Sequence, residues 1–148
     1  MVTIVPKKAG ELMVSGQPDA VFLLIHGTFG CRSEFAFPDS FLAEALKARI
    51  TGSVVFRRFE WDGFNSHECR LRAAKDLVAV LENQVSEFPS SRHFIIAHSH
   101  GGNVAGYALK ESAVAKRVAR VYTLATPFIC ARPRWGEEES RRRAIAPT

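Results

Sequence analysis

The stretch FIIAHSHGGNVAG, residues 94–106, decides the fold of this chain of 148 residues. Its continuously apolar start predicts a buried strand over Phe94–Ala97. The pattern from Gly102 to Glu111 predicts a helix. Ser99 therefore lies where a strand becomes a helix with almost no loop, and such a turn holds the serine in a strained backbone conformation.

The residues around Ser99 indicate the chemistry that this turn permits. Ala97 and Gly101, two positions to either side, are small because larger side chains there would collide with the strand and the helix. The turn projects the hydroxyl beyond the sheet and places the amide of His100 at a helix N-terminus, where it can donate to an oxyanion. His98 and His100 flank the serine, but adjacent side chains on a tight turn point apart, so neither is expected to act as its base. The competing interpretation is a turn serine without chemistry.

Outward from this stretch, short apolar runs alternate with helical patterns, which predicts an α/β domain with a mostly parallel sheet. The expected strands are Thr3–Val5, Glu11–Ser15, Val21–Ile25, a strand from Val54 toward Trp61, and Val121–Leu124. One helix is expected over Ser40–Arg49 with Asp39 as its cap, and a second over His67–Glu87 with Asn65 or Ser66 as its cap. The second helix should bury one stripe, formed by Leu71, Ala74, Val78, Leu81 and Val85.

Two segments resemble a known family. The run Ala97-His98-Ser99-His100-Gly101-Gly102 looks like the nucleophile elbow of α/β-hydrolases, in the variant with Ala in place of the first Gly. The run His26–Gly30 (HGTFG) directly follows a central strand, as does the family loop that contributes the second oxyanion amide. By position the donor there is Thr28, with Phe29 second. Similarity to the family extends to the strand end at Leu124–Phe128 and, less specifically, to a Trp-x-Gly-x-Asn-Ser segment formed by Trp61, Gly63, Asn65 and Ser66.

The resemblance implies an α/β-hydrolase-like three-layer sandwich, with residues 1–131 as an incomplete domain and 132–148 as a loose charged tail. On this view the chain stops after about the sixth of eight strands, through an early stop, a frameshift or the chosen chain boundaries. The family's catalytic triad runs in the order Ser, acid, His. No Asp follows Ser99 and no His follows His100, so only glutamates such as Glu137–Glu139 remain as acids.

The implied function is that of a serine esterase or lipase-like hydrolase that cleaves carboxylic esters through an acyl-enzyme, impaired by the missing acid and His. Its nucleophile would be Ser99, and the amides of Thr28 and His100 would form its oxyanion hole. The alternative is a non-catalytic α/β-hydrolase-like module that binds a ligand, or a partner chain along its exposed last strand.

Composition and charge narrow the classes of function and partner that remain. The net charge of +5 is diffuse apart from an arginine-rich tail, so nucleic-acid binding is not expected. Three widely spaced cysteines, Cys31, Cys69 and Cys130, predict neither a disulfide framework nor a metal site, and they favour a reducing cytoplasm. Neither a secretory signal nor a transmembrane run is recognisable. The expected partner is a small ester or lipid-like substrate, and no cofactor is implied.

Overall fold

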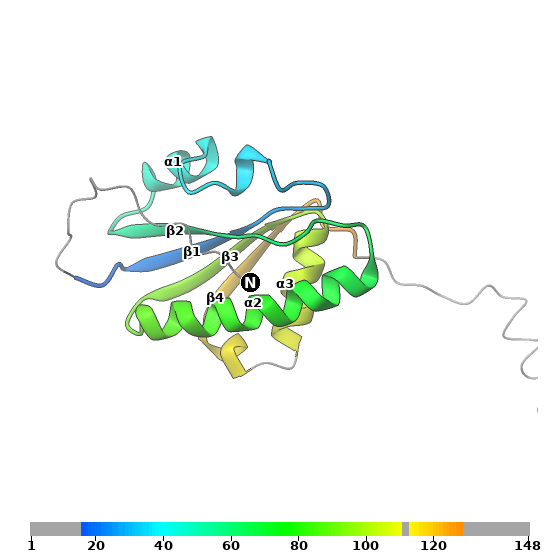
Figure 1. Ribbon diagram of the computed structural model, residues 1–148. Coiled ribbons are helices and arrows are strands. Elements are labelled where there is room, and N and C mark those ends of the chain that lie inside the picture. The colour runs from blue at the N-terminus through cyan, green and yellow to red at the C-terminus, as the bar shows by residue number, and fades with distance from the viewer. Residues whose placement is uncertain (1–15, 111–112, 129–148) are drawn as a thin grey trace, which may run out of the picture.

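The computed structural model describes residues 16–110 and 113–128, which form a parallel sheet with helices on both faces (Figure 1). The strands expected at Thr3–Val5 and Glu11–Ser15, and the tail expected from 132 onward, lie outside the described residues. The described strands are β1 (Ala20–Ile25), β2 (Val54–Phe59), β3 (Arg92–His98) and β4 (Val118–Leu124). The helices are η1 (Glu34–Ala36), α1 (Phe41–Lys47), α2 (His67–Glu87), α3 (His100–Lys110) and η2 (Ala113–Arg117).

The four described strands are parallel and lie in the order β2-β1-β3-β4. Ile25 pairs with Ala97 across β1 and β3, and His98 pairs with Leu124 across β3 and β4. The sequence prediction that the runs ending at Ile25, Ala97 and Leu124 are neighbouring parallel strands is therefore confirmed. Because parallel strands end at the same edge of a sheet, the loops after all four strands, Ser99 included, meet at one edge.

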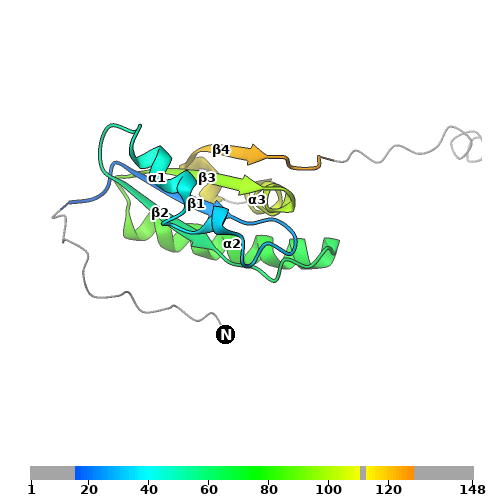
Figure 2. The same ribbon diagram turned by 90° about the horizontal axis from the view of Figure 1, so that it is seen from above.

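Helix α1 lies on one side of the sheet and α2 on the other (Figure 1 and Figure 2), and each face of the sheet has its own apolar core. On one face α2 and α3 cover Leu23, Ile25 and Ile95, all fully buried. On the opposite face α1 contributes Ala43, and η1 contributes Ala36, to a cluster with Phe22 and Ile96. Phe22 also stacks with Phe56 and Phe94 across three strands at centroid distances of 5.0 and 4.8 Å. The continuously apolar β1 is thus buried on both faces, as its sequence predicted.

The first helix begins one residue later than expected, and its predicted cap is wrong. Ser40, not Asp39, has the extended backbone of an N-cap, and its Oγ accepts from the Ala43 N–H at 3.2 Å. Both residue types can cap a helix, so only the backbone path decides between them. The helix ends at Lys47, and Arg49 N–H donates to Leu46 in the tighter turn that follows.

Of the two caps considered for α2, Ser66 is used, and its Oγ accepts from the Cys69 N–H at 3.4 Å. Asn65 instead accepts from the side chain of Arg70 at 3.2 Å. The predicted buried stripe is correct at Ala74 and Leu81 but wrong at Leu71, which is 41% exposed.

The contribution of α2 to the core begins only at Ala73. Leu71, two residues before Ala73, therefore lies outside the part of the helix that packs on the core.

Three boundaries of the later elements also differ from the sequence prediction. β2 ends at Phe59 and does not reach Trp61, whose side chain turns inward, as described below. β4 starts at Val118 rather than Val121, and α3 starts directly after Ser99 rather than at Gly102. Among the described residues, no helix is long and apolar enough to cross a membrane.

Candidate active site

Ser99 joins β3 to α3 without any intervening loop. Its φ is 50°, in the left-handed region that non-glycine residues avoid, so the backbone strain expected from its neighbours is present. Three hydrogen bonds hold this conformation: Ser99 N–H donates to Leu124 O at 2.8 Å, and Ser99 O accepts from Gly102 N–H at 3.0 Å and from Thr126 Oγ1 at 2.9 Å. Because helix α3 starts at His100, the amide of that residue belongs to the first turn, whose N–H groups have no acceptor within the helix.

Three glycines allow the chain to pack closely around Ser99. A Cβ at Gly27 would lie 2.8 Å from the Cβ of Ser99, so the loop after β1 passes directly against the serine. A Cβ at Gly101 would lie 2.5 Å from the carbonyl oxygen of His26, and one at Gly102 would collide with Thr126. The small residue that the sequence required at Gly101 is explained by this contact between α3 and the end of β1.

His26, the first residue after β1, is fully buried and joins the β1 loop to the β2 loop. Its ring stacks on Trp61 with centroids 5.7 Å apart, and Trp61 Nε1 donates to His26 O at 3.0 Å. Trp61 N–H donates to His26 Nε2 at 3.4 Å, while His26 Nδ1 lies 2.8 Å from Gly27 O. Trp61 therefore leaves the strand after Phe59 because its indole and amide both bind this histidine.

The partners of His26 assign its protonation. A carbonyl oxygen only accepts, so Nδ1 carries the proton toward Gly27 O; an amide N–H only donates, so Nε2 is the unprotonated acceptor for Trp61. Burial lowers the pKa of His26 below its ordinary value, which favours this neutral form. Both nitrogens are engaged, so His26 positions the loop and is not free to take a proton from Ser99.

The loop after β1 continues through Thr28 and Phe29. Phe29 also has a left-handed backbone, with φ of 56°, and its N–H donates to Gly63 O at 2.9 Å. Gly63 itself has φ of 69°, and a Cβ there would lie 3.1 Å from Phe29 N. The Thr28 Oγ1 atom is buried without a hydrogen-bond partner among the described residues. The loop is thus held by its flanks, at His26 and Phe29, with Thr28 between them.

The other histidines are placed differently. His93 lies in the core at the start of β3, where Nδ1 contacts Gln84 at 3.1 Å and Nε2 contacts Phe88 O at 3.0 Å; burial lowers its pKa. His67, at the start of α2, packs edge-on against Tyr107 with centroids 5.5 Å apart. Both residues belong to the packing of α2.

His98 and His100 flank Ser99, as the sequence requires. His98 is exposed at the end of β3, with its ring 5.7 Å from that of Phe35. His100 Nδ1 lies 2.9 Å from Asn103 Oδ1, and Asn103 Nδ2 donates to Pro127 O at 3.4 Å. Since Pro127 O can only accept, the amide of Asn103 presents its oxygen to His100, and His100 Nδ1 is the donor. His100 is therefore tied to its own helix.

Asp62, in the β2 loop, is committed to local structure. Its Oδ1 accepts from the Phe64 N–H at 3.0 Å and its Oδ2 pairs with Arg72 at 3.2 Å. Desolvation raises the pKa of Asp62, but these hydrogen bonds outweigh it and the pKa lies below its ordinary value. Within the described ranges, no three His, Cys, Asp or Glu side chains gather as metal ligands would.

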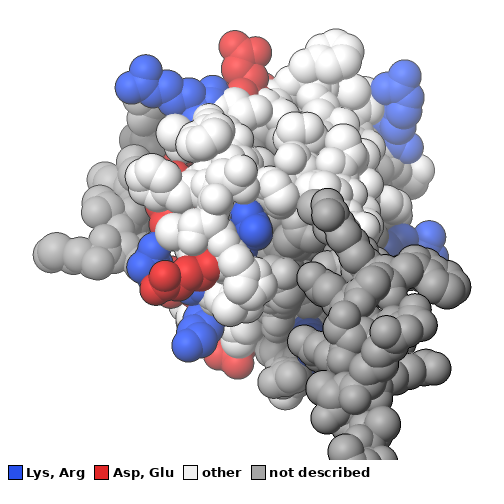
Figure 3. Space-filling model, turned by 90° about the vertical axis from the view of Figure 1, so that its right-hand side faces the viewer, with Lys and Arg blue, Asp and Glu red and all other residues white. Residues whose placement is uncertain are grey.

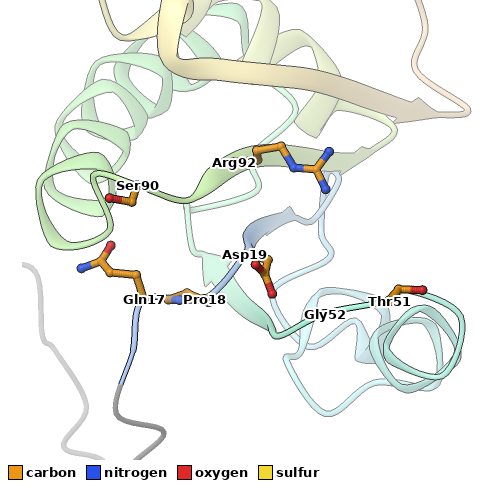
Figure 4. Close-up of a pocket in the computed structure, with 7 residues that line it drawn as sticks. All are labelled: Gln17, Pro18, Asp19, Thr51, Gly52, Ser90 and Arg92. Carbon is orange, nitrogen blue, oxygen red and sulfur yellow. The ribbon is translucent and has the colours of Figure 1, made fainter.

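Two hollows lie in the described part of the chain. One, of about 480 Å³, is at the edge where the strands begin, and its side chains are spread around it rather than gathered at one point (Figure 4). The other, of about 430 Å³, is an apolar groove between α1 and the sheet, bordered by Tyr122 and Leu124 of β4. Strain and close packing mark the Ser99 edge.

Sequence reasoning missed two features of this edge. Ala125, directly after β4, has φ of 52°, so Phe29, Ser99 and Ala125 are the three non-glycine residues with positive φ among those described. All three lie in loops that follow strand ends. Neither Phe nor Ala favours that conformation, so no residue type signals it in advance. The inward turn of Trp61 was equally hidden, although its match to the Trp-x-Gly-x-Asn-Ser segment pointed to this loop.

Comparison with known proteins identifies the class. The family model described as the alpha/beta hydrolase family matches residues 22–148. Similar solved structures include two of acetyl xylan esterase, one an iodinated complex (12% identity, TM-score 0.59) and one at 0.90 Å resolution (14% identity, TM-score 0.52). In both comparisons 79% of this chain matches 67% of the esterase.

The mature Bacillus licheniformis lipase BlEst2 is also similar, at 23% identity and a TM-score of 0.50, over 75% of this chain and 41% of the lipase. No curated protein sequence matches the chain. The solved structures are all below 25% identity and establish the fold. Because the family model covers most of the sequence, the chain belongs to the alpha/beta hydrolase family.

Proposed function

We propose that the protein is a serine hydrolase of the esterase or lipase type that cleaves carboxylic esters through an acyl-enzyme, with Ser99 as the nucleophile. The observation that carries the proposal is the backbone of Ser99, which has φ of 50° between β3 and α3 in a chain of this family. Ala97, His98, Gly101 and Gly102 complete the nucleophile elbow. In a nucleophile elbow, a strained turn between strand and helix serves to expose the serine hydroxyl.

The oxyanion hole would be formed by the amides of Thr28 and His100. His100 N–H lies in the first turn of α3. On the other side, Phe29 N–H already donates to Gly63 O, which leaves Thr28 as the better donor of the pair that the sequence suggested. The contact between Gly27 and Ser99 supports the same assignment, because it brings the β1 loop against the serine. Fixed donors of this kind stabilise the charge that develops on a carbonyl oxygen.

In the first step Ser99 Oγ would attack the ester carbonyl carbon, its proton would pass to the leaving alkoxide, and the alcohol would depart from the acyl-enzyme. Water would then hydrolyse the acyl-enzyme and release the acid. A serine needs a base for the first proton transfer. His26 and His93 use both ring nitrogens in local contacts, and no His follows His100 in the sequence. We therefore propose that the chain of 148 residues, by itself, is a slow hydrolase.

The test is labelling of the purified chain with a fluorescent alkyl phosphonate, together with turnover of p-nitrophenyl butyrate. We expect weak labelling at Ser99, none in Ser99→Ala, and residual turnover that changes little in His98→Ala. Loss of a catalytic His costs about a million-fold in a well-studied serine protease, so slow turnover is the expected scale. Saturable, fast turnover that Ser99→Ala abolishes would show that an upstream histidine serves as base. Labelling that persists in Ser99→Ala would refute the nucleophile.

A second candidate function is that of a module that binds a partner chain along β4. In the described part of the chain β4 pairs on one side only, with β3, and Tyr122 and Leu124 are each 42% exposed beside the apolar groove. An unpaired strand edge can accept another strand. Arg120→Pro would remove one backbone donor of this strand, and we expect it to weaken such a complex in a pull-down more than Ser99→Ala does.

We also propose a reducing, cytoplasmic location. Cys31 and Cys69 are free thiols in the structure, and Cys31 is exposed. Titration of thiols in chain isolated with rapid alkylation should find all three cysteines reduced, and a disulfide would contradict this proposal.

A further inference from the structure

Three large apolar side chains stand out from the loops around Ser99. The exposed fractions are 76% for Phe29, 60% for Phe64 and 70% for Phe128. They follow β1, β2 and β4 respectively, so all three lie at the edge where the parallel strands end. Exposure of a phenylalanine side chain to water is unfavourable. Several exposed phenylalanines at one edge of a protein indicate an interaction surface.

The three phenylalanines are held in place on either side of the serine. Phe29 N–H donates to Gly63 O at 2.9 Å, which makes Phe29 and Phe64 neighbours across the β1 and β2 loops. On the far side of Ser99, Phe128 N–H donates to Thr126 O at 3.0 Å, and the side chain of Thr126 donates to Ser99 O. Two rings thus lie on one flank of the serine and one on the other.

Backbone strain shows that the exposure of Phe29 is not a side effect of a loose loop. Its φ of 56° is a conformation that a bulky residue adopts only when its surroundings impose it, at a cost of about 1–3 kcal/mol. Its amide is fixed to Gly63 while its side chain remains in solvent. The fold therefore maintains a strained turn at Phe29 that leaves its aromatic ring exposed to solvent.

The charges near these rings indicate whether the surface would bind a charged or a neutral apolar interface. Seen from this side, the described part of the edge is largely uncharged, with basic side-chain surface near its middle and other charged side chains toward its border (Figure 3). On the β2 side the charges are paired: Arg58 with Glu60 at 3.0 Å and Arg72 with Asp62 at 3.2 Å. Paired charges of both signs favour neither an anionic membrane nor a cationic surface.

We propose that Phe29, Phe64 and Phe128 form an interfacial surface that enters a neutral, water-insoluble ester phase and brings it to Ser99. The binding itself needs no catalysis, and its purpose beside Ser99 rests on the proposed function. The rings protrude and line neither of the two hollows described above, so they fit a deformable phase better than a single bound molecule. Side chains of this kind bind an interface through buried apolar area.

Flotation with tributyrin emulsion tests the proposal without any turnover. The wild-type chain should float with the droplets in 0.05 M and in 0.5 M NaCl alike, because burial of apolar surface is not screened by salt. The triple variant Phe29→Asn, Phe64→Ser, Phe128→Ser should lose at least about tenfold in partitioning. Asn is chosen at position 29 because it tolerates positive φ, and unfolding midpoints should show that the variants fold.

The matched control is Phe41→Ser, which removes a ring that is 91% exposed on α1, over the sheet face rather than at its end. It should float as the wild type does. Equal flotation of the triple variant, an equal loss in Phe41→Ser, or flotation abolished by 0.5 M NaCl would overturn the proposal. Ser99→Ala should retain flotation. If the wild-type chain floated but its serine showed no reactivity, the proposed function would be overturned and the interfacial surface would stand.

Discussion

The two ends of the sheet differ in how their backbones are held. At the end where the strands finish, Phe29, Ser99 and Ala125 all have positive φ, and glycines let three loops pack against one another. At the end where the strands begin, the unfavourable φ of 105° falls on a glycine, Gly52. Among the described residues, backbone strain is therefore concentrated at the edge that carries Ser99, and strain maintained by a fold is a sign of function.

The starting edge of the sheet is instead satisfied locally. The carboxylate of Asp19 accepts from the Ser53 N–H at 2.7 Å and from Ser53 Oγ at 3.0 Å, which joins β1 to β2 and holds the pKa of Asp19 below its ordinary value. Arg92 N–H donates to Asp19 O at 3.0 Å and adds β3 to the same tie. Asp19, which lines the hollow beside these residues, therefore already uses its Oδ2 atom in two hydrogen bonds.

The largest effect that tests this comparison is expected at Gly101. A methyl group there would lie 2.5 Å from His26 O and 3.0 Å from Ile25 O, and backbone atoms cannot move aside as a flexible side chain can. We expect Gly101→Ala to lower the free energy of unfolding by about 2–3 kcal/mol, as overpacking does elsewhere. Urea unfolding followed by circular dichroism measures it. A loss below about 0.5 kcal/mol would mean that α3 and β1 are not in tight contact.

Much of this packing could be predicted from sequence, because local patterns encode it. The apolar runs at Val21–Ile25 and Phe94–Ala97 have few alternatives to buried parallel strands, and the small residues beside Ser99 indicated the turn. Asp39 and Ser40 are equally good caps by type, and helical periodicity does not reveal where the core ends, so Leu71 was misplaced. Such choices depend on contacts between distant segments.

The inward turn of Trp61 shows the same limit at the site itself. Its two hydrogen bonds to His26 join positions 35 residues apart, and no local pattern predicts that pair. The strained φ of Phe29 likewise results from its bond to Gly63 in another loop. The sequence placed Ser99 at the turn between strand and helix, whereas the way the loops fix one another required the structure.

The second prediction concerns the hydrogen bond from Trp61 to His26, which links the β2 loop to the β1 loop. Trp61→Phe removes the indole donor to His26 O, a hydrogen bond to a buried carbonyl, and we expect the free energy of unfolding to fall by about 2 kcal/mol. Because the same bond steadies the loop that carries Thr28, phosphonate labelling of Ser99 should also slow.

The matched control is Tyr122→Phe, which alters an aromatic side chain that is 42% exposed on β4 and should change stability by less than about 0.5 kcal/mol. Equal stabilities for both variants would show that the indole bond does not hold the loop.

A third prediction uses pH. Burial lowers the pKa values of His26, at the strained edge, and His93, in the core near the other edge. An unfolded histidine binds a proton below its ordinary pKa of about 6.5, which the folded form resists, so these residues contribute fully above that pH and less as pH falls below it. Urea unfolding should give a lower free energy at pH 5.5 than at pH 7.5.

The individual histidines separate the two regions. His93→Gln should reduce this pH dependence without affecting the Ser99 edge, whereas protonation of His26 removes its acceptor for the Trp61 N–H and should loosen the Thr28 loop. His98→Gln, at an exposed position, serves as the control. Stability that is the same at both pH values would contradict the assignment of neutral, buried rings.

The smallest expected effect is an increase in the free energy of unfolding, and it concerns a residue of α3, the helix that also carries Gly101. Gly106, like Gly101, is a glycine of α3, but a Cβ at Gly106 would meet no atom within 4 Å. Glycine in a helix interior is less favourable than alanine because the unfolded chain loses more conformational freedom. Gly106→Ala should therefore raise the free energy of unfolding by about 0.5–1 kcal/mol in the urea assay used for Gly101→Ala. Since both changes add one methyl group to one helix, helix propensity cancels from their difference, and what remains measures the contact of α3 with the end of β1. If both variants were stabilised alike, the close packing of the Ser99 edge would be wrong.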